Sequence, residues 1–254
     1  MSSKEIIIEK KFNNYRLDNV LVELDLVKNK SKALSNIMMG NIYVNEKKVE
    51  KCGFKIKSGS ILRFKLEKRW VSRGGTKLNF ALKKFSVGVN GKSCLDIGCS
   101  TGGFSDVLLQ GGAKEVSGID VGYGQIDLKI RNNERFNIFE RTNARNLGDS
   151  FFKNKFDIIV CDASFISLKK IIPPILKFLK IKGLICFLIK PQFEVGKDKV
   201  SKGGIIKDCV LQKTVCDGIK FFFEKKHNLE FKNFCESPIS GQKGNKEFFM
   251  LFKK

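Results

Sequence analysis

The chain has 254 residues, enough for one large domain or for a large and a small one. Its formal net charge of +22 favours a polyanionic partner, nucleic acid or an anionic membrane, over a merely solvated basic surface. Eight cysteines without a C-x-x-C pair and a single histidine argue against a metal site. The charged N-terminus argues against a signal peptide, and the chain lacks an apolar run long enough to span a membrane. Because eight thiols without such signals suit a reducing compartment, we expect a cytoplasmic protein.

The first part of the chain predicts two short helices followed by a small sheet. Apolar residues first recur at helical spacing, and Gly40 then provides a stop for the second helix. Further on, apolar and basic residues alternate as they do in a half-buried strand. In chain order we expect an edge strand at 5–9, helices at 16–26 and 31–39, a hairpin at 42–49 and a strand at 61–66.

Two short stretches here resemble a known RNA-binding module. Arg16-Leu17-Asp18 with Leu21, and the run GNIYVN at 40–45, resemble the αL module that many RNA-modifying enzymes carry. The resemblance implies a small α+β RNA-binding domain over residues 1–67; any small α+β domain with a basic face is the alternative. The basic residues expected to contact RNA are Arg16, Lys28, Lys30, Lys32, Lys47 and Lys48.

Residues 68–72 are predicted to form a tight linker. They include Trp70, the only tryptophan, which would pack either between the domains or in one ordinary core. Beyond the linker, apolar runs of strand length alternate with helical patterns, which is typical of a mostly parallel sheet with helices on both faces. The last two strands have little between them, which indicates an antiparallel edge strand. We therefore expect a Rossmann-like α/β domain over residues 73–254.

The elements of this domain are predicted as follows. A helix opens at 72–78, before the first strand. Strands are expected at 94–97, 115–119, 137–140, 156–161, 184–189, 229–235 and 248–252, with helices at 104–110, 168–179 and 206–225.

A glycine-rich turn after the first of these strands predicts a binding pocket. Gly98 can adopt a positive φ, and the following helix start directs its free amides into the pocket. The spacing is not G-x-G-x-x-G, because Ser100 replaces the second glycine, and it is not a P-loop, because Phe104 follows Gly103. The turn resembles the D-x-G-x-x-x-G loop of S-adenosylmethionine-dependent methyltransferases; a plain strand–turn–helix is the alternative. The resemblance implies cofactor contacts from Asp96, Gly98, Ser100, Gly102, Gly103 and Phe104.

Polar residues also end the next strands. Asp120 suits the hydroxyls of a ribose, with an exposed strand-end carboxylate as the alternative, and Asn143 follows the third strand where an adenine edge would lie. Asp162 ends the fourth strand, where we expect it to contact both the cofactor and the reacting groups. The prolines typical of amine methyltransferases are missing there, which argues against an amine target. Cys161 alternates into the sheet and is predicted to be a buried thiol.

Four charged residues far apart in sequence could meet at one rim of this fold. Lys190 ends a buried apolar strand and is a candidate general base, with a snorkelling lysine as the alternative. Lys77 precedes the first strand, and Glu247 begins the last one. A Lys–Asp–Lys–Glu set suits attack by a ribose 2′-hydroxyl, because the base has to be neutral and a second lysine disfavours protonation of the first.

Further segments resemble the TlyA family, whose members join an αL module to a methyltransferase domain of the FtsJ/RrmJ type. These segments are SRG at 72–74, ERTNAR at 140–145, SFISL at 164–168 and KPQFEVGK at 190–197. The resemblance implies 2′-O-methylation of cytidine in 16S or 23S ribosomal RNA, with S-adenosylmethionine as methyl donor. It also implies that Lys77, Asp162, Lys190 and Glu247 form a catalytic tetrad.

Two other functions have to be weighed. Some relatives in the TlyA family carry the label haemolysin, so a membrane-active protein is one alternative; the missing apolar span and the cofactor loop argue against it. An RNA-binding protein on an inactive methyltransferase fold is the other, and the intact tetrad argues against that. The modified nucleotide and the oligomeric state are left open by the sequence.

Overall fold

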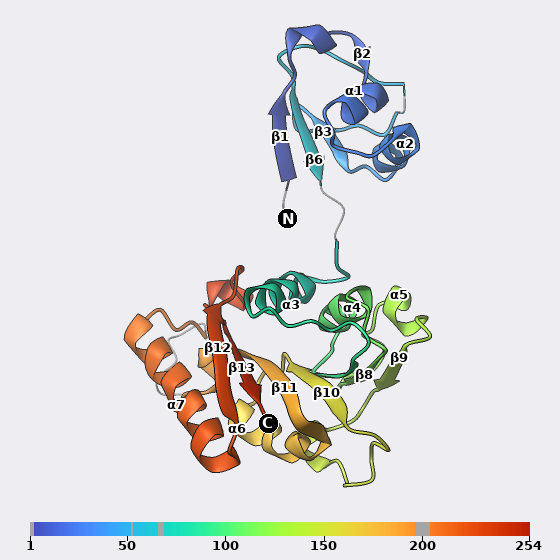
Figure 1. Ribbon diagram of the computed structural model, residues 1–254. Coiled ribbons are helices and arrows are strands. Elements are labelled where there is room, and N and C mark those ends of the chain that lie inside the picture. The colour runs from blue at the N-terminus through green and yellow to red at the C-terminus, as the bar shows by residue number, and fades with distance from the viewer. Residues whose placement is uncertain (1–2, 52, 66–68, 197–203) are drawn as a thin grey trace. The chain divides into compact units, whose positions relative to one another are not determined.

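The protein divides into two compact units, Met1–Arg69 and Trp70–Lys254. The computed structural model shown in Figure 1 describes residues 3–51, 53–65, 69–196 and 204–254. Of the predicted linker, residue 68 lies outside the described residues, and Trp70 to Ser72 belong to the second unit. Trp70 is buried in a core cluster of that unit together with Leu78, and Ser72 caps the helix that follows. Of the two alternatives for this tryptophan, the structure shows the ordinary core position.

The first unit pairs two short helices with an antiparallel sheet. Its four-stranded sheet has the order β1-β6-β3-β4, and β2 pairs with β5. The helices pack on this sheet through a core that includes Leu17, Ile37 and Leu62. Asn29 caps the second helix by accepting a hydrogen bond from the amide of Lys32. The elements are β1 (Ser3–Ile7), η1 (Lys10–Phe12), β2 (Tyr15–Arg16), α1 (Leu17–Glu23), α2 (Lys30–Met38), β3 (Ile42–Val44), β4 (Lys47–Lys48), β5 (Lys55–Ile56) and β6 (Ile61–Lys65).

The second unit is built on a seven-stranded sheet with the order β12-β13-β11-β10-β7-β8-β9. Neighbouring strands from β11 to β9 are parallel, and β13 is antiparallel to both of its neighbours. The predicted mostly parallel α/β sheet is thus confirmed, and the antiparallel strand lies one place inside the edge. The strands are β7 (Ser93–Ile97), β8 (Glu115–Ile119), β9 (Phe136–Phe139), β10 (Phe156–Cys161), β11 (Leu179–Ile189), β12 (Glu230–Glu236) and β13 (Phe248–Lys253).

Helices cover both faces of this sheet (Figure 1). One core cluster joins the sheet to α3, α4 and α5, and the other joins it to α6, η3 and α7. Because strand side chains alternate between faces, Leu95 packs on the α7 side while Cys94 packs on the α3 side. The helices are α3 (Arg73–Lys84), α4 (Gly103–Gln110), α5 (Leu128–Arg131), η2 (Ala144–Asn146), α6 (Leu168–Ile171), η3 (Pro173–Phe178), η4 (Pro191–Phe193), α7 (Cys209–His227) and η6 (Gln242–Gly244).

One predicted helix is broken. The single helix expected at 168–179 is observed as α6 followed by η3, and β11 then starts at Leu179 rather than at Leu184. Pro173 and Pro174 begin η3, and proline lacks the amide that an α-helix needs in its interior. The apolar periodicity alone did not reveal this break.

The sheet order creates a crevice at the carboxyl ends of β7 and β10. The chain runs outward from β7 through β8 to β9 and then returns to β10 on the other side of β7. In an open α/β sheet, such a reversal point is where ligands bind. Because β13 is antiparallel, its first residue lies at the same rim, where Phe248 pairs with Ile189 at the end of β11. The segments after β7, β10 and β11 and before β13 therefore meet there.

Candidate active site

The glycine turn after β7 has a left-handed backbone at three positions. Gly98, Ser100 and Gly102 all have a positive φ, at 74°, 47° and 89°. The strain at the non-glycine position is offset by Asp120, whose Oδ2 accepts a hydrogen bond from the Ser100 amide at 2.8 Å. The other oxygen of Asp120 accepts from the Gly122 amide at 2.8 Å. Asp120 thus ties the turn to the end of β8 while its remaining lone pairs stay available to a ligand hydroxyl.

Asp96 supports the same turn from beneath. Its side chain is fully buried on the α4 side of the sheet, and its Oδ2 accepts a hydrogen bond from the Ser105 hydroxyl at 2.7 Å. Burial raises the pKa of this carboxyl to about 7. Asp96 lies under the first turn of α4 and does not line the cavity, and the cofactor contact expected of it stays a prediction.

The start of α4 lies against the start of α3. A Cβ atom on Gly103 would come within 2.0 Å of Ser72 Oγ and 3.0 Å of the Gly75 nitrogen, so only glycine allows this approach. Ser72 Oγ accepts a hydrogen bond from the Gly74 amide at 3.2 Å and caps α3. The close packing brings α3, and Lys77 on it, to the rim of the sheet.

A cavity of about 220 Å³ opens between the glycine turn, α3 and the segments that follow β10 and β11. Of the predicted cofactor residues, Gly98, Ser100, Gly103, Phe104 and Asp162 line it, whereas Asp96, Gly102, Asp120 and Asn143 do not. The complete lining is Ser72, Gly74, Lys77, Gly98, Cys99, Ser100, Thr101, Gly103, Phe104, Asp162, Ser164, Lys190, Gln192, Phe193 and Glu247.

Asn143 has a local task in the structure. Its side-chain oxygen accepts hydrogen bonds from the amide of Arg145 at 3.1 Å and from Nε of the same arginine at 3.2 Å, and it thereby caps η2. The contact with an adenine edge that the sequence suggested stays a prediction.

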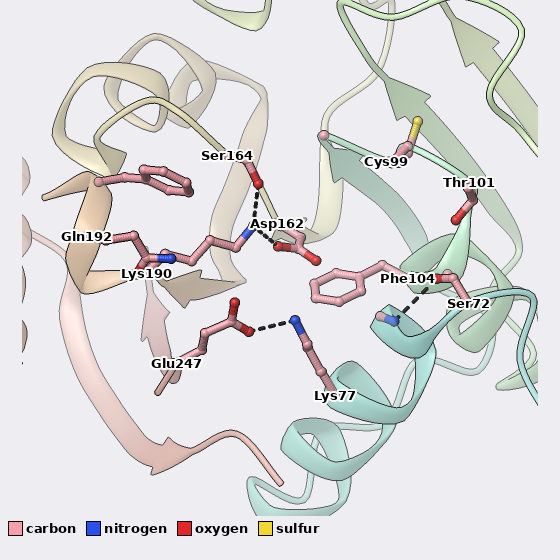
Figure 2. Close-up of a pocket in the computed structure, with 15 residues that line it drawn as sticks. Ser72, Lys77, Cys99, Thr101, Phe104, Asp162, Ser164, Lys190, Gln192 and Glu247 are labelled. Atoms are coloured by element: carbon pink, nitrogen blue, oxygen red, sulfur yellow. Dashed lines mark hydrogen bonds and ion pairs between the residues drawn. The ribbon is translucent and has the colours of Figure 1, made fainter. Parts of the chain in front are cut away.

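The four predicted catalytic side chains meet at this cavity as two ion pairs (Figure 2). Lys77 Nζ lies 2.6 Å from Glu247 Oε2, and Lys190 Nζ lies 2.6 Å from Asp162 Oδ1. The side chains of Lys77, Lys190 and Glu247 are 11%, 9% and 3% exposed, so both pairs are largely desolvated. Two lysine amines and two carboxylates are therefore held together at one wall of the cavity.

Each member of this set comes from a different element, which explains their distance in sequence. Asp162 and Lys190 directly follow β10 and β11, and Glu247 directly precedes β13. Lys77 reaches the rim from the first half of α3. Glu247 is further fixed because its backbone oxygen accepts a hydrogen bond from the Ser237 amide at 2.8 Å. The rim of the sheet, rather than any local segment, assembles the set.

Two neighbouring residues after β10, Ser164 and Phe165, had no assigned role in the sequence prediction, and of the two only Ser164 lines the cavity. Ser164 Oγ accepts a hydrogen bond from Lys190 Nζ at 2.7 Å. Phe165, next to it, has a positive φ of 64°, is 84% exposed and lies against the Phe193 ring at a centroid distance of 5.0 Å. Both belong to the SFISL segment, but nothing in that segment distinguishes an exposed phenylalanine from a core one. Only the backbone geometry after β10 turns Phe165 outward.

Cys161 is buried, as predicted. Its side chain is inaccessible on the α7 side of the sheet, and burial raises the pKa of the thiol to about 12. A thiol in that environment stays protonated and is a poor nucleophile. Among the described residues, no group of three or more histidine, cysteine, aspartate or glutamate side chains is placed to hold a metal ion.

The predicted RNA contacts all belong to the first unit and are exposed. Arg16 also forms a bidentate contact with the buried carboxylate of Asp18, at 2.7 and 3.1 Å. Lys30 lies 4.0 Å from the same carboxylate, and Lys48 pairs with Glu50. Among the helices that the structure describes, none combines the length and the apolar character needed to cross a membrane.

Comparison with known proteins identifies the family. Residues 70–254 match the model of the FtsJ-like methyltransferases. Hemolysin A of Brachyspira hyodysenteriae is 40% identical over 240 residues, covering 93% of this chain and 99% of the relative. A 16S/23S rRNA (cytidine-2′-O)-methyltransferase TlyA of Mycobacterium tuberculosis is 36% identical over 242 residues, covering 94% and 89%.

A solved structure from Streptococcus thermophilus, named "Putative hemolysin", is 35% identical, superposes with a TM-score of 0.72 and covers 96% of this chain and 89% of its own. Sequence and fold thus agree over both units of the chain. The chain therefore belongs to the TlyA family of FtsJ-like methyltransferases.

Proposed function

We propose that the protein transfers a methyl group from S-adenosylmethionine to the ribose 2′-hydroxyl of a cytidine in ribosomal RNA. The observation that carries the proposal is the pair of buried lysine–carboxylate contacts, Lys190–Asp162 and Lys77–Glu247, facing the glycine turn across one cavity. The TlyA relative is named for this reaction, and it aligns over 94% of the chain. The proposed site of action is the cytoplasm.

The residues around the glycine turn fit the methyl donor. When bound, S-adenosylmethionine supplies an electrophilic methyl group on a positively charged sulfur. The first amides of α4 have no acceptor within their own helix, so they would donate hydrogen bonds to the carboxylate of the methyl donor. Asp120 retains free lone pairs for ribose hydroxyls, and Asp162, with 21% of its side chain exposed, offers a negative charge to a cationic group. Phe104 gives the cavity an apolar wall.

We assign the role of general base to Lys190. A ribose hydroxyl is a poor nucleophile, so its proton has to leave as the new bond to carbon forms. The neutral amine of Lys190 would take that proton, and Asp162 would then stabilise the resulting ammonium. Lys77, held by Glu247, would keep its charge and donate a hydrogen bond to the sugar oxygen. Placement of the hydroxyl in line with the methyl group would supply much of the remaining rate enhancement over the uncatalysed reaction.

Exposed aromatic and basic groups suit an RNA substrate. The exposed ring of Phe165, which lies against the cavity-lining Phe193, is a surface on which a nucleobase could stack. In the first unit, we propose that Arg16, Lys28, Lys30, Lys32, Lys47 and Lys48 contact RNA phosphates. Phosphate contacts release counterions, so the affinity for ribosomal RNA should fall steeply between low and physiological salt. A salt-independent affinity would remove this role from the six residues.

The catalytic assignment is tested by Lys190→Ala. Methyl transfer to ribosomal subunits from cells lacking the gene should fall by about 10² to 10⁴-fold, the range for a lost general base. S-adenosylmethionine affinity, measured by calorimetry, should stay unchanged. Lys114→Ala is the control, because this exposed lysine precedes β8 at the opposite end of the strand from the cavity. Near-normal turnover by Lys190→Ala would refute the role.

A second function, membrane lysis, is suggested by the names of two similar proteins, the Hemolysin A of Brachyspira hyodysenteriae and the "Putative hemolysin" of Streptococcus thermophilus. The same protein preparation should be added to dye-loaded liposomes with anionic lipid. We expect methyl transfer and no dye release. Dye release without methyl transfer would favour the lytic function, and the absence of both would favour an RNA-binding protein on an inactive fold.

A further inference from the structure

We propose that Ser164 is a positioning residue for the methyl transfer proposed above: it orients the amine of Lys190 and connects it to solvent. The proposal rests on the proposed function. Ser164 lies two residues beyond the end of β10, lines the cavity, and accepts a hydrogen bond from Lys190 Nζ at 2.7 Å (Figure 2). Lys190 itself is 8% exposed, whereas Ser164 is exposed.

The orientation follows from the valences of the amine. A neutral lysine amine has two N–H bonds and one lone pair, and rotation about its last carbon–nitrogen bond has three staggered positions. Two oxygens lie beside Nζ, Asp162 Oδ1 at 2.6 Å and Ser164 Oγ at 2.7 Å. One N–H bond is donated to Ser164 Oγ, and the negative charge of the Asp162 carboxylate disfavours the lone pair on its side, so the lone pair takes the remaining position. With Asp162 alone, the lone pair has no fixed direction.

The same hydroxyl provides a route for the proton. As the bond between the methyl carbon and the sugar oxygen forms, the methyl–sulfur bond breaks with its electron pair going to sulfur, and the hydroxyl proton moves to Lys190 Nζ. The ammonium then has to return one proton to water before the next turnover. The Asp162 carboxylate only accepts hydrogen bonds, whereas the Ser164 hydroxyl accepts from the ammonium and donates its own proton to water.

The segment that carries Ser164 is held by contacts that do not involve its hydroxyl. Phe165 packs on Phe193, and Glu194 accepts hydrogen bonds from the Ser167 hydroxyl at 2.6 Å and from the Leu168 amide at 2.8 Å. These contacts join the loop after β10 to the loop after β11. Removing the Ser164 hydroxyl therefore changes the surroundings of Lys190 while leaving the loop in place.

The test compares Ser164→Ala, Ser164→Thr and the control Ser167→Ala in single-turnover methyl transfer to ribosomal subunits, with enzyme in excess. We expect Ser164→Ala to slow the transfer step by about tenfold or more, with an unchanged dissociation constant for the subunits and unchanged S-adenosylmethionine affinity. Ser164→Thr keeps the hydroxyl and should restore the rate to within about threefold of wild type. Ser167→Ala removes one hydrogen bond to Glu194 but keeps the Leu168 amide bond to Glu194 and the Lys190–Ser164 bond, so it should transfer at the wild-type rate.

Wild-type protein in the same assay distinguishes a failure of the proposed function from a failure of the Ser164 role. If wild type transfers no methyl group, the proposed function fails. If wild type is active and Ser164→Ala matches it, or if Ser164→Ala and Ser167→Ala are slowed equally, the positioning role is overturned. If threonine fails to restore the rate that alanine removes, the hydroxyl is not the group responsible.

Discussion

The buried pair between Lys77 and Glu247 makes a stability prediction that is independent of activity. Nζ and Oε2 are 2.6 Å apart, and the two side chains are only 11% and 3% exposed, so neither charge can be solvated if its partner is removed. Breaking such a pair from one side typically costs about 3–5 kcal/mol. We therefore expect Lys77→Met and Glu247→Gln each to destabilise the second unit by that amount.

Urea unfolding followed by tryptophan fluorescence measures this effect. The chain has one tryptophan, Trp70, which is 7% exposed in the same core cluster as Leu78 of α3, so its emission reports on the second unit. A loss of about 3 kcal/mol corresponds to a midpoint lowered by about 1–3 M urea. Lys83→Met is the matched control on the same helix, because Lys83 is exposed, and its midpoint should stay close to wild type.

The double variant Lys77→Met with Glu247→Gln completes the cycle. Removing both charges leaves no unpaired ion in the interior, so the double variant should be more stable than either single variant. If the single variants lose less than about 1 kcal/mol, the pair is solvated in the folded chain, and the electrostatic account of the site is wrong. Additive losses in the double variant would refute a direct interaction between the two side chains.

Gly103→Ala places a Cβ 2.0 Å from Ser72 Oγ, so denaturant unfolding should show a loss of about 1–3 kcal/mol. The same change at Gly148, where space is open, should be neutral. Burial raises the pKa of Asp96 from 3.8 to about 7. Between these two pKa values the folded chain holds a proton that the unfolded chain has lost, so the free energy of unfolding falls as the pH rises through this range. In denaturant unfolding at about pH 5 and about pH 8, the free energy of unfolding of wild type should fall by on the order of 2 kcal/mol more than that of Asp96→Asn. Equal losses in the two proteins would contradict the raised pKa.

The sequence by itself determined the local elements and the type of chemistry. Alternating strand and helix patterns predicted the parallel sheet, because periodicity depends only on which side of one element faces a core. The residues from Gly98 to Phe104 argued against dinucleotide and P-loop binding, since such turns depend on a few neighbouring residues, and the resemblance to a methyltransferase loop implied a methyl donor. The broken helix at Pro173 shows where periodicity alone was too coarse.

Only the tertiary structure decided which charges face each other. Lys77 and Glu247 are 170 residues apart, and their contact depends on the antiparallel direction of β13, which puts its first residue at the rim where parallel strands end. Likewise, Asp96 lies one residue before the end of β7 and Asp120 directly follows the adjacent β8, yet sheet packing buries the first under α4 and leaves the second to hold the turn. Strand order and direction depend on contacts between distant segments, and no local pattern encodes them.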